Sequence, residues 1–221
     1  MMLRFILISL GFISLNACIE AQQLRSLGLK TGISISNQHV LFTLPDRDYR
    51  METQILAGPS ASFFVEFAKG ERWSLETDLS YSSKGSSTTT ESITVYHLEN
   101  NRITENEGEL TSTRMHYLSL APQLRYRFPG NKLRPYLLLG PRIDLLMGYS
   151  NDSGYPLDEQ NKIIPGISTG AGLELQAGRL GLFLEGLYLL DALPLTQDDP
   201  VHIRNRGGQV NLGIRLYRPN L

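Results

Sequence analysis

The sequence lacks the residues on which several classes of protein depend. Its 221 residues include one cysteine, Cys18, so no disulfide can form within the chain. No cluster of histidine and cysteine has the spacing of a metal site. Lysine and arginine total 21 against 22 aspartates and glutamates, and no basic stripe stands out, so nucleic acid is not an expected partner. No segment carries the apolar stripe of an amphipathic helix. These absences argue against metal, thiol and nucleic-acid functions and against a helical fold.

The N-terminal residues have the order of a secretory signal peptide. MMLR supplies a positive charge, Phe5–Leu15 is an apolar core too short to cross a bilayer as a helix, and small residues follow it. We expect cleavage after Ala21, so residues 1–21 are the predicted signal peptide and residues 22–221 the mature domain. The alternative is lipid attachment at Cys18, because residues 15–18 are similar to a lipoprotein signal. Cleavage after Ala21 would leave a mature chain without any thiol.

Residues 166–190, GISTGAGLELQAGRLGLFLEGLYLL, are long and apolar enough to suggest a membrane helix, yet they contain Glu174, Arg179 and Glu185. Up to Ala177, one set of alternate positions is apolar and the other is small or polar, which is the two-residue period of a strand. The phase resets after the Gly-Arg pair at 178–179, and the alternation resumes. We therefore predict a hairpin whose charges lie on the face opposite the leucines.

The same period recurs along most of the chain. It predicts eight strands, which cover residues 27–35, 59–67, 73–81, 118–128, 137–147, 166–177, 180–190 and 210–216. Most of them have the roughly 9–11 residues that a tilted strand needs to cross a bilayer. The fold class that we predict is all-β: an eight-stranded antiparallel up-and-down transmembrane β-barrel.

The connections between the predicted strands alternate in length. The short ones cover residues 68–72, 129–132 and 178–179, and the long ones cover about 37–56, 83–113, 149–163 and 191–208. This alternation is typical of an outer-membrane barrel with short periplasmic turns and long extracellular loops. The serine- and threonine-rich tract at 82–92 is predicted to be a mobile loop.

Aromatic residues near both ends of the predicted strands point outward, as the two interfaces of a bilayer require. Those near the short turns are Phe67, Trp73 and Phe128, and those near the long loops are Tyr81, Tyr149 and Tyr188. Two prolines, Pro122 and Pro141, fall within predicted strands. Because proline cannot donate to a strand ladder, we expect a bulge or bend at these positions.

The other face of the predicted strands collects charges of both signs. We expect a polar network inside the barrel formed by Lys30, Glu66, Glu76, Asp78, Arg125, Arg127, Arg142, Asp144, Glu174, Glu185 and Arg215. Eight strands enclose a lumen just wide enough for side chains, so these charges are expected to pair as a structural filling. The alternative for the lumen is a gated path for a small solute. The alternative for the fold is a soluble barrel with the apolar face inside, but the glycines on the polar face favour lipid outside.

Several segments together resemble the outer-membrane β-barrel domain family, also called the porin family, of small eight-stranded barrels of Gram-negative bacteria. They are MHYLSLAPQLRYRF, LRPYLLLGPRIDLLMG, GISTGAGLELQAGRLGLFLEGLYLL and GGQVNLGIRLY. The resemblance covers nearly the whole mature chain, and Pro122 and Gly140-Pro141 match prolines common in that family. It implies an integral protein of the cell outer membrane. The C-terminus departs from the family, since four residues follow Tyr217 where such barrels usually finish on an aromatic residue.

The function predicted from these features is a structural or surface-interaction role, without catalytic, cofactor-binding or metal-binding residues. The expected partners are outer-membrane lipid, the outer-membrane assembly machinery and, through the long loops, an extracellular or envelope protein. The alternatives are an accessory subunit of an export or uptake assembly and a small-solute pore. A lipid-modifying enzyme ranks lower. It would need a serine such as Ser82 or Ser83 beside His116, and nothing in the spacing selects that pair. The other histidines, His39, His97 and His202, lie in predicted loops.

Overall fold

The computed structural model describes the backbone of residues 23–43, 48–52, 54–68, 70–89, 93–97, 102–106, 110–130, 132–151, 161–193 and 201–218. The predicted signal peptide with Cys18 lies outside these ranges, and so do the side chains of His39, His97 and His202. Among the described residues, no helix is long and apolar enough to cross a membrane.

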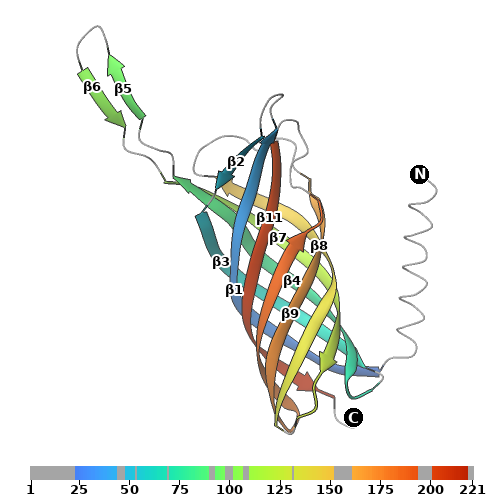
Figure 1. The fold of residues 1–221 in the computed structure, drawn as a ribbon. Coiled ribbons are helices and arrows are strands. Elements are labelled where there is room, and N and C mark those ends of the chain that lie inside the picture. The colour runs from blue at the N-terminus through green and yellow to red at the C-terminus, as the bar shows by residue number, and fades with distance from the viewer. Residues whose placement is uncertain are drawn as a thin grey trace, which may run out of the picture.

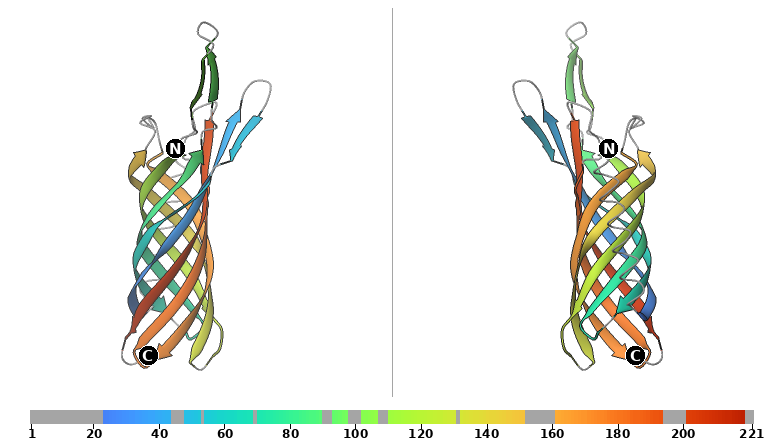
Figure 2. Two further views of the ribbon diagram at one scale, coloured as in Figure 1. Left: turned by 90° about the vertical axis from the view of Figure 1, so that its left-hand side faces the viewer. Right: turned by 90° about the vertical axis from the view of Figure 1, so that its right-hand side faces the viewer.

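The predicted eight-stranded antiparallel barrel is confirmed (Figures 1 and 2). Its strands are β1 (Gln23–Thr43), β3 (Gln54–Ala68), β4 (Trp73–Thr89), β7 (Leu110–Arg127), β8 (Leu133–Asn151), β9 (Ile163–Ala177), β10 (Leu180–Asp191) and β11 (Val201–Tyr217). Each strand pairs with its neighbour in sequence order, and pairing between β1 and β11 closes the sheet. Three short strands lie in the predicted loops: β2 (Asp48–Glu52), β5 (Ile93–His97) and β6 (Arg102–Asn106).

Several strands are longer than the sequence predicts. β1 continues to Thr43, where it pairs with both β2 and β11, and β4 pairs with β7 as far as Thr89 opposite Leu110. The predicted loop boundaries at 37, 83 and 208 are therefore wrong, and much of the serine- and threonine-rich tract belongs to β4. The reason is physical: backbone pairing continues beyond the bilayer, where the outward residues no longer need to be apolar.

The outward face of the barrel is apolar, and the inward face carries the charges. Leucines such as Leu139, Leu184 and Leu212 are more than half exposed, whereas Arg142, Glu185 and Arg215 on the same three strands are buried. The aromatic residues Trp73 and Phe128 at the short-turn end, and Tyr81, Tyr149 and Tyr188 at the other end, are exposed as well. This facing is the inverse of a soluble ligand-binding barrel and suits a lipid environment.

The two prolines cause no bulge. Leu120 lies opposite Ile143 and Leu124 opposite Leu139, so the register of β7 with β8 is the same on both sides of Pro122 and Pro141. The prolines consequently lie opposite one another. The expected bulge at the prolines is wrong. The register shift of this strand pair falls between His116 and Tyr117 instead.

Proline has no backbone N–H to donate. At both Pro122 and Pro141 the absent N–H would have pointed toward the other strand of the β7–β8 pair. The ladder of β7 with β4 runs unbroken through Pro122, and the ladder of β8 with β9 runs unbroken through Pro141. The two absent N–H groups therefore interrupt the hydrogen bonding between β7 and β8 at a single place. The strands also approach closely here. A Cβ added at Gly140 would lie 2.7 Å from Gln123 Cα and closer still to the carbonyl oxygen of Pro122.

We predict that Gly140→Ala lowers the free energy of unfolding by about 1–3 kcal/mol, because the new methyl group meets backbone that cannot move aside. The control is Gly186→Ala, since nothing lies within 4 Å of a Cβ at that position. Urea unfolding of the folded protein in lipid vesicles measures both. Equal stability of the two variants would contradict the close approach at the proline seam.

Candidate functional site

All eleven residues expected inside the barrel are there, and none is more than 3% exposed. They come from all strands of the barrel: β1 (Lys30), β3 (Glu66), β4 (Glu76, Asp78), β7 (Arg125, Arg127), β8 (Arg142, Asp144), β9 (Glu174), β10 (Glu185) and β11 (Arg215). The two-residue period positions them, because each lies on the face opposite the outward leucines.

Arg215 is the centre of the network at the periplasmic half of the lumen. Its guanidinium forms ion pairs with Glu66, Glu76 and Glu174, and the distance from Nη2 to Glu76 Oε2 is 2.7 Å. The three glutamates come from three different strands, so one cation from the last strand joins β3, β4 and β9. Its Nη1 also donates to Ser26 Oγ at 2.9 Å, on the first strand.

Two further arginines, both on β7, complete this layer. Arg125 pairs with Glu76 and, at 3.1 Å, with Glu174, while Arg127 Nη2 lies 2.6 Å from Glu66 Oε1. Three arginines thus face three glutamates in a neutral group that spans the lumen. We call these six residues the charged plug: Glu66, Glu76, Arg125, Arg127, Glu174 and Arg215.

Lys30 holds a second group of acids just above the plug. Its Nζ lies 2.8 Å from both Asp78 Oδ2 and Glu185 Oε1 and 3.5 Å from Glu76 Oε1. Glu185 also accepts hydrogen bonds from Tyr136 Oη at 3.1 Å and from Asn211 Nδ2 at 3.3 Å. Each carboxylate in this group therefore lies beside the Lys30 cation, although Asp78 Oδ1 has no hydrogen-bond partner of its own.

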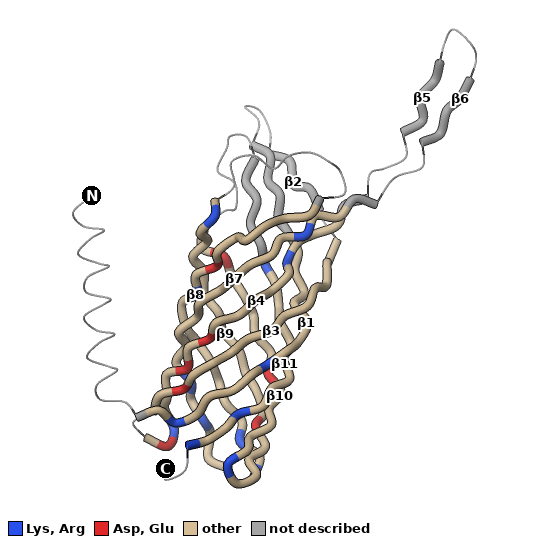
Figure 3. Tube along the Cα trace, turned by 180° about the vertical axis from the view of Figure 1, so that it is seen from behind, with Lys and Arg blue, Asp and Glu red and all other residues tan. Residues whose placement is uncertain are grey.

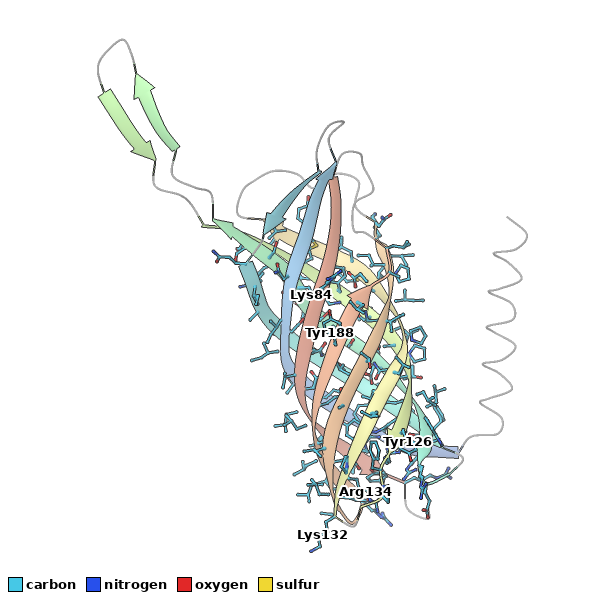
Figure 4. All side chains as sticks on the ribbon, in the orientation of Figure 1. Lys84, Tyr126, Lys132, Arg134 and Tyr188 are labelled. Atoms are coloured by element: carbon cyan, nitrogen blue, oxygen red, sulfur yellow. The ribbon has the colours of Figure 1, made fainter. Side chains whose placement is uncertain are left out.

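The extracellular half of the lumen contains a third group, which sequence reasoning found only in part. Lys84, which Figure 4 labels, has its Nζ 2.6 Å from Asp144 Oδ2. Arg142 pairs with Asp144 and with Asp191. Lys84 and Asp191 were missed because both fall in segments predicted to be loops. Two small cavities of about 10 and 20 Å³ lie in this half, each with room for only a water molecule or two, and Lys84 and Arg142 line both of them.

Aromatic rings fill much of the remaining lumen and were also missed. Phe64, Tyr136 and Phe183 are almost fully buried, and the rings of Phe64 and Phe183 are 5.6 Å apart in an edge-to-face arrangement. The guanidinium of Arg125 stacks 3.5 Å from the centre of the Tyr136 ring. The alternation within β3, β8 and β10 was the signal that could have found them, because each ring shares the parity of a charged lumen residue.

The serine and histidine residues considered for an enzyme do not form a catalytic arrangement. Ser83 lies opposite His116 in the register of β4 and β7. However, His116 Nδ1 shares a hydrogen bond of 2.8 Å with the hydroxyl of Tyr81, which points to the outside of the barrel. Among the described residues, no group of histidines and carboxylates could hold a metal ion.

Residues 20–193 match a protein family described as "Outer membrane protein beta-barrel domain". The chain belongs to this family. Its location is accordingly the outer membrane, and the resemblance seen in the sequence is confirmed. No protein with a curated function matches the sequence significantly.

Solved structures similar to this outer-membrane barrel include OprG from Pseudomonas aeruginosa, with a TM-score of 0.55, 10% identity and coverage of 90% of this chain and 99% of that one. For Neisserial surface protein A the TM-score is 0.46 and the identity is 12%, with coverage of 86% of this chain and 97% of that one. For the outer membrane protease OmpT from Escherichia coli the TM-score is 0.47 and the identity is 8%, with coverage of 89% of this chain and 98% of that one. At 10% identity the likeness to OprG shows the fold and nothing about activity.

We predict that Arg215→Met lowers the free energy of unfolding of this barrel by about 3–5 kcal/mol, because three buried glutamates lose a shared cation. Adding Glu66→Gln restores the charge balance of the plug and should recover part of the loss.

The control is Arg206→Met, on the same strand but exposed, which should change stability by less than about 0.5 kcal/mol. Urea unfolding in lipid vesicles compares the four proteins. A loss at Arg215 no larger than that at Arg206 would contradict the central place of Arg215 in the plug.

Proposed function

We propose that this outer-membrane barrel is a closed structural protein that presents its extracellular strands for surface interaction. The observation that carries the proposal is the charged plug. Three arginines and three glutamates from five strands contact one another across the lumen, and none of them is more than 2% exposed. Opening a path there would separate charges that are costly to leave unpaired at low dielectric.

The surface half of the proposal rests on the strands that extend beyond the apolar band. On β1 the last outward apolar side chain described is Ile35, yet pairing with β11 continues to Phe42. The strands β5 and β6 form a sheet of their own, separate from the barrel sheet. Neither the extension nor this hairpin is needed to close the barrel, so both are available to a partner outside the cell.

An enzymatic function is not part of the proposal, because His116 is bonded to a tyrosine rather than to a serine. The second candidate function is a small-solute pore. The observation in its favour is the pair of small cavities, of about 10 and 20 Å³, above the plug, but the plug lies between them and the periplasm. We further propose outer-membrane lipid, the assembly machinery and an extracellular or envelope protein as partners. A role as accessory subunit of a larger assembly would use the same external surface.

We predict no steady single-channel steps when the purified barrel is inserted into planar bilayers, because the plug closes the lumen. A known open porin in the same membrane serves as the positive control, and a mobility shift on boiling verifies that the inserted sample is folded. Steps of reproducible amplitude from the folded protein would replace the closed barrel with the pore.

We predict that replacing residues 93–106 with a short Gly-Ser turn leaves folding intact, because β5 and β6 form a sheet of their own. The same change should reduce binding of nanodisc-embedded protein to cell surfaces toward that of empty nanodiscs. Binding and the boiling-dependent mobility shift are measured on both proteins. Unchanged binding by the folded variant would remove the hairpin from the proposed interaction surface.

A further inference from the structure

The periplasmic end of the barrel is surrounded by basic side chains. We call these residues the basic collar: Arg72, Lys132, Arg134, Arg179 and Arg218. They come from all three short turns, the start of β8 and the end of β11, so they are distributed around the whole rim. Figure 3 shows basic positions gathered at this end, and Figure 4 places Lys132 and Arg134 there. The only acidic side chain exposed on the described part of the rim is Glu71.

The collar lies at the depth of lipid headgroups. In each short turn a basic residue is followed directly by an outward apolar one: Arg72 by Trp73, Lys132 by Leu133, and Arg179 by Leu180. These apolar side chains are 55%, 54% and 43% exposed. Because a strand rises roughly 3.4 Å per residue, each cation lies one short step below the edge of the hydrocarbon layer.

An aromatic layer marks the same boundary. The ring of Trp73 lies 4.6 Å from that of Tyr126, which lies 5.0 Å from Phe128. Aromatic side chains gather where hydrocarbon meets headgroups. The turn before Trp73 is held in place by Arg25, whose Nη1 donates to the carbonyl oxygens of Gly70 and Glu71 at 3.0 and 3.4 Å. The cation at Arg72 is therefore presented on a fixed turn.

The collar cations do not form ion pairs with acidic side chains of the described residues. Among the described residues none of the five forms an ion pair, in contrast with the arginines of the charged plug. Arg134 donates from Nε to the carbonyl oxygen of Gly130 at 3.2 Å, which leaves its two terminal nitrogens for another acceptor. Four of the five side chains are exposed, and Arg134 is half-buried.

We propose that the basic collar binds the anionic headgroups of phospholipids in the periplasmic leaflet. The guanidinium fork of arginine matches the oxygens of a phosphate diester, and a lysine adds a mobile point charge. The paired arrangement of cation and exposed apolar side chain matches a lipid of this leaflet, whose phosphate lies on the periplasmic side of its acyl chains. A soluble phosphate would use only half of this arrangement.

The single tryptophan of the chain, Trp73, reports on this contact directly. The test is quenching of its fluorescence by brominated acyl chains, with the barrel in vesicles of mixed phosphatidylglycerol and phosphatidylcholine. Bromine is placed on one lipid and then on the other. We expect the anionic lipid to be favoured beside Trp73 by about fivefold at low salt, because each cation near a charged lipid contributes roughly this factor.

The triple variant Arg72→Gln/Lys132→Gln/Arg179→Gln should bring this preference close to one. The matched control, Lys162→Gln/Arg206→Gln, removes exposed cations from the other end and should leave the preference unchanged. The boiling-dependent mobility shift shows that each variant is folded. A wild-type salt titration gives an independent measure, and the preference should fall as salt screens the charges.

Three results would overturn the proposal: no preference in the wild type, a preference that survives in the folded triple variant, or an equal loss in the control. Retention of the protein on an anionic cell-wall polymer without any lipid preference would also overturn it, and would assign the collar to that polymer.

Discussion

The contact of Arg215 with Glu66, Glu76 and Glu174 is the constraint on which the interior of this barrel depends. A barrel in lipid has polar residues inside and apolar residues outside, so its core cannot be stabilised by hydrophobic burial in the ordinary way. Charges removed from water must then be paired almost completely. Arg215 meets this demand from the closing strand, and it brings acids of three other strands to one point.

The remaining lumen is built around that point. Aromatic rings pack beside the cations, and several of them lie over glycines: Phe64 over Gly28, Tyr136 over Gly172 and Phe183 over Gly213. A side chain at any of these glycines would displace a ring. The polar face is therefore rich in glycine because rings and guanidinium groups need the space. The filled interior in turn leaves the rims and the extracellular strands as the surfaces of the barrel that lie outside the hydrocarbon layer.

The alternation of residue types predicted the barrel and the eleven charges of its polar face, because lipid outside and charge inside impose a two-residue period. The glycines on the polar face predicted that this face lies inside. It did not predict the ends of the strands. Beyond Tyr81 the apolar positions of β4 give way to Ser83 and Gly85, which are buried, so the pattern disappears while the backbone pairing persists. Lys84 was not predicted as a lumen residue because it lies in this part of β4. The opposed prolines were also beyond sequence reasoning, since only the register of β7 and β8 places Pro122 against Pro141.

Magic-angle-spinning NMR of the barrel in lipid bilayers would test the plug most directly. The measurement is the dipolar coupling between the guanidinium nitrogens of Arg215 and the side-chain carboxyl carbons of glutamate. The account predicts short-range contacts to Glu66, Glu76 and Glu174 together, from a guanidinium shielded from water. An Arg215 side chain in contact with water and with no glutamate carboxylate would contradict the account.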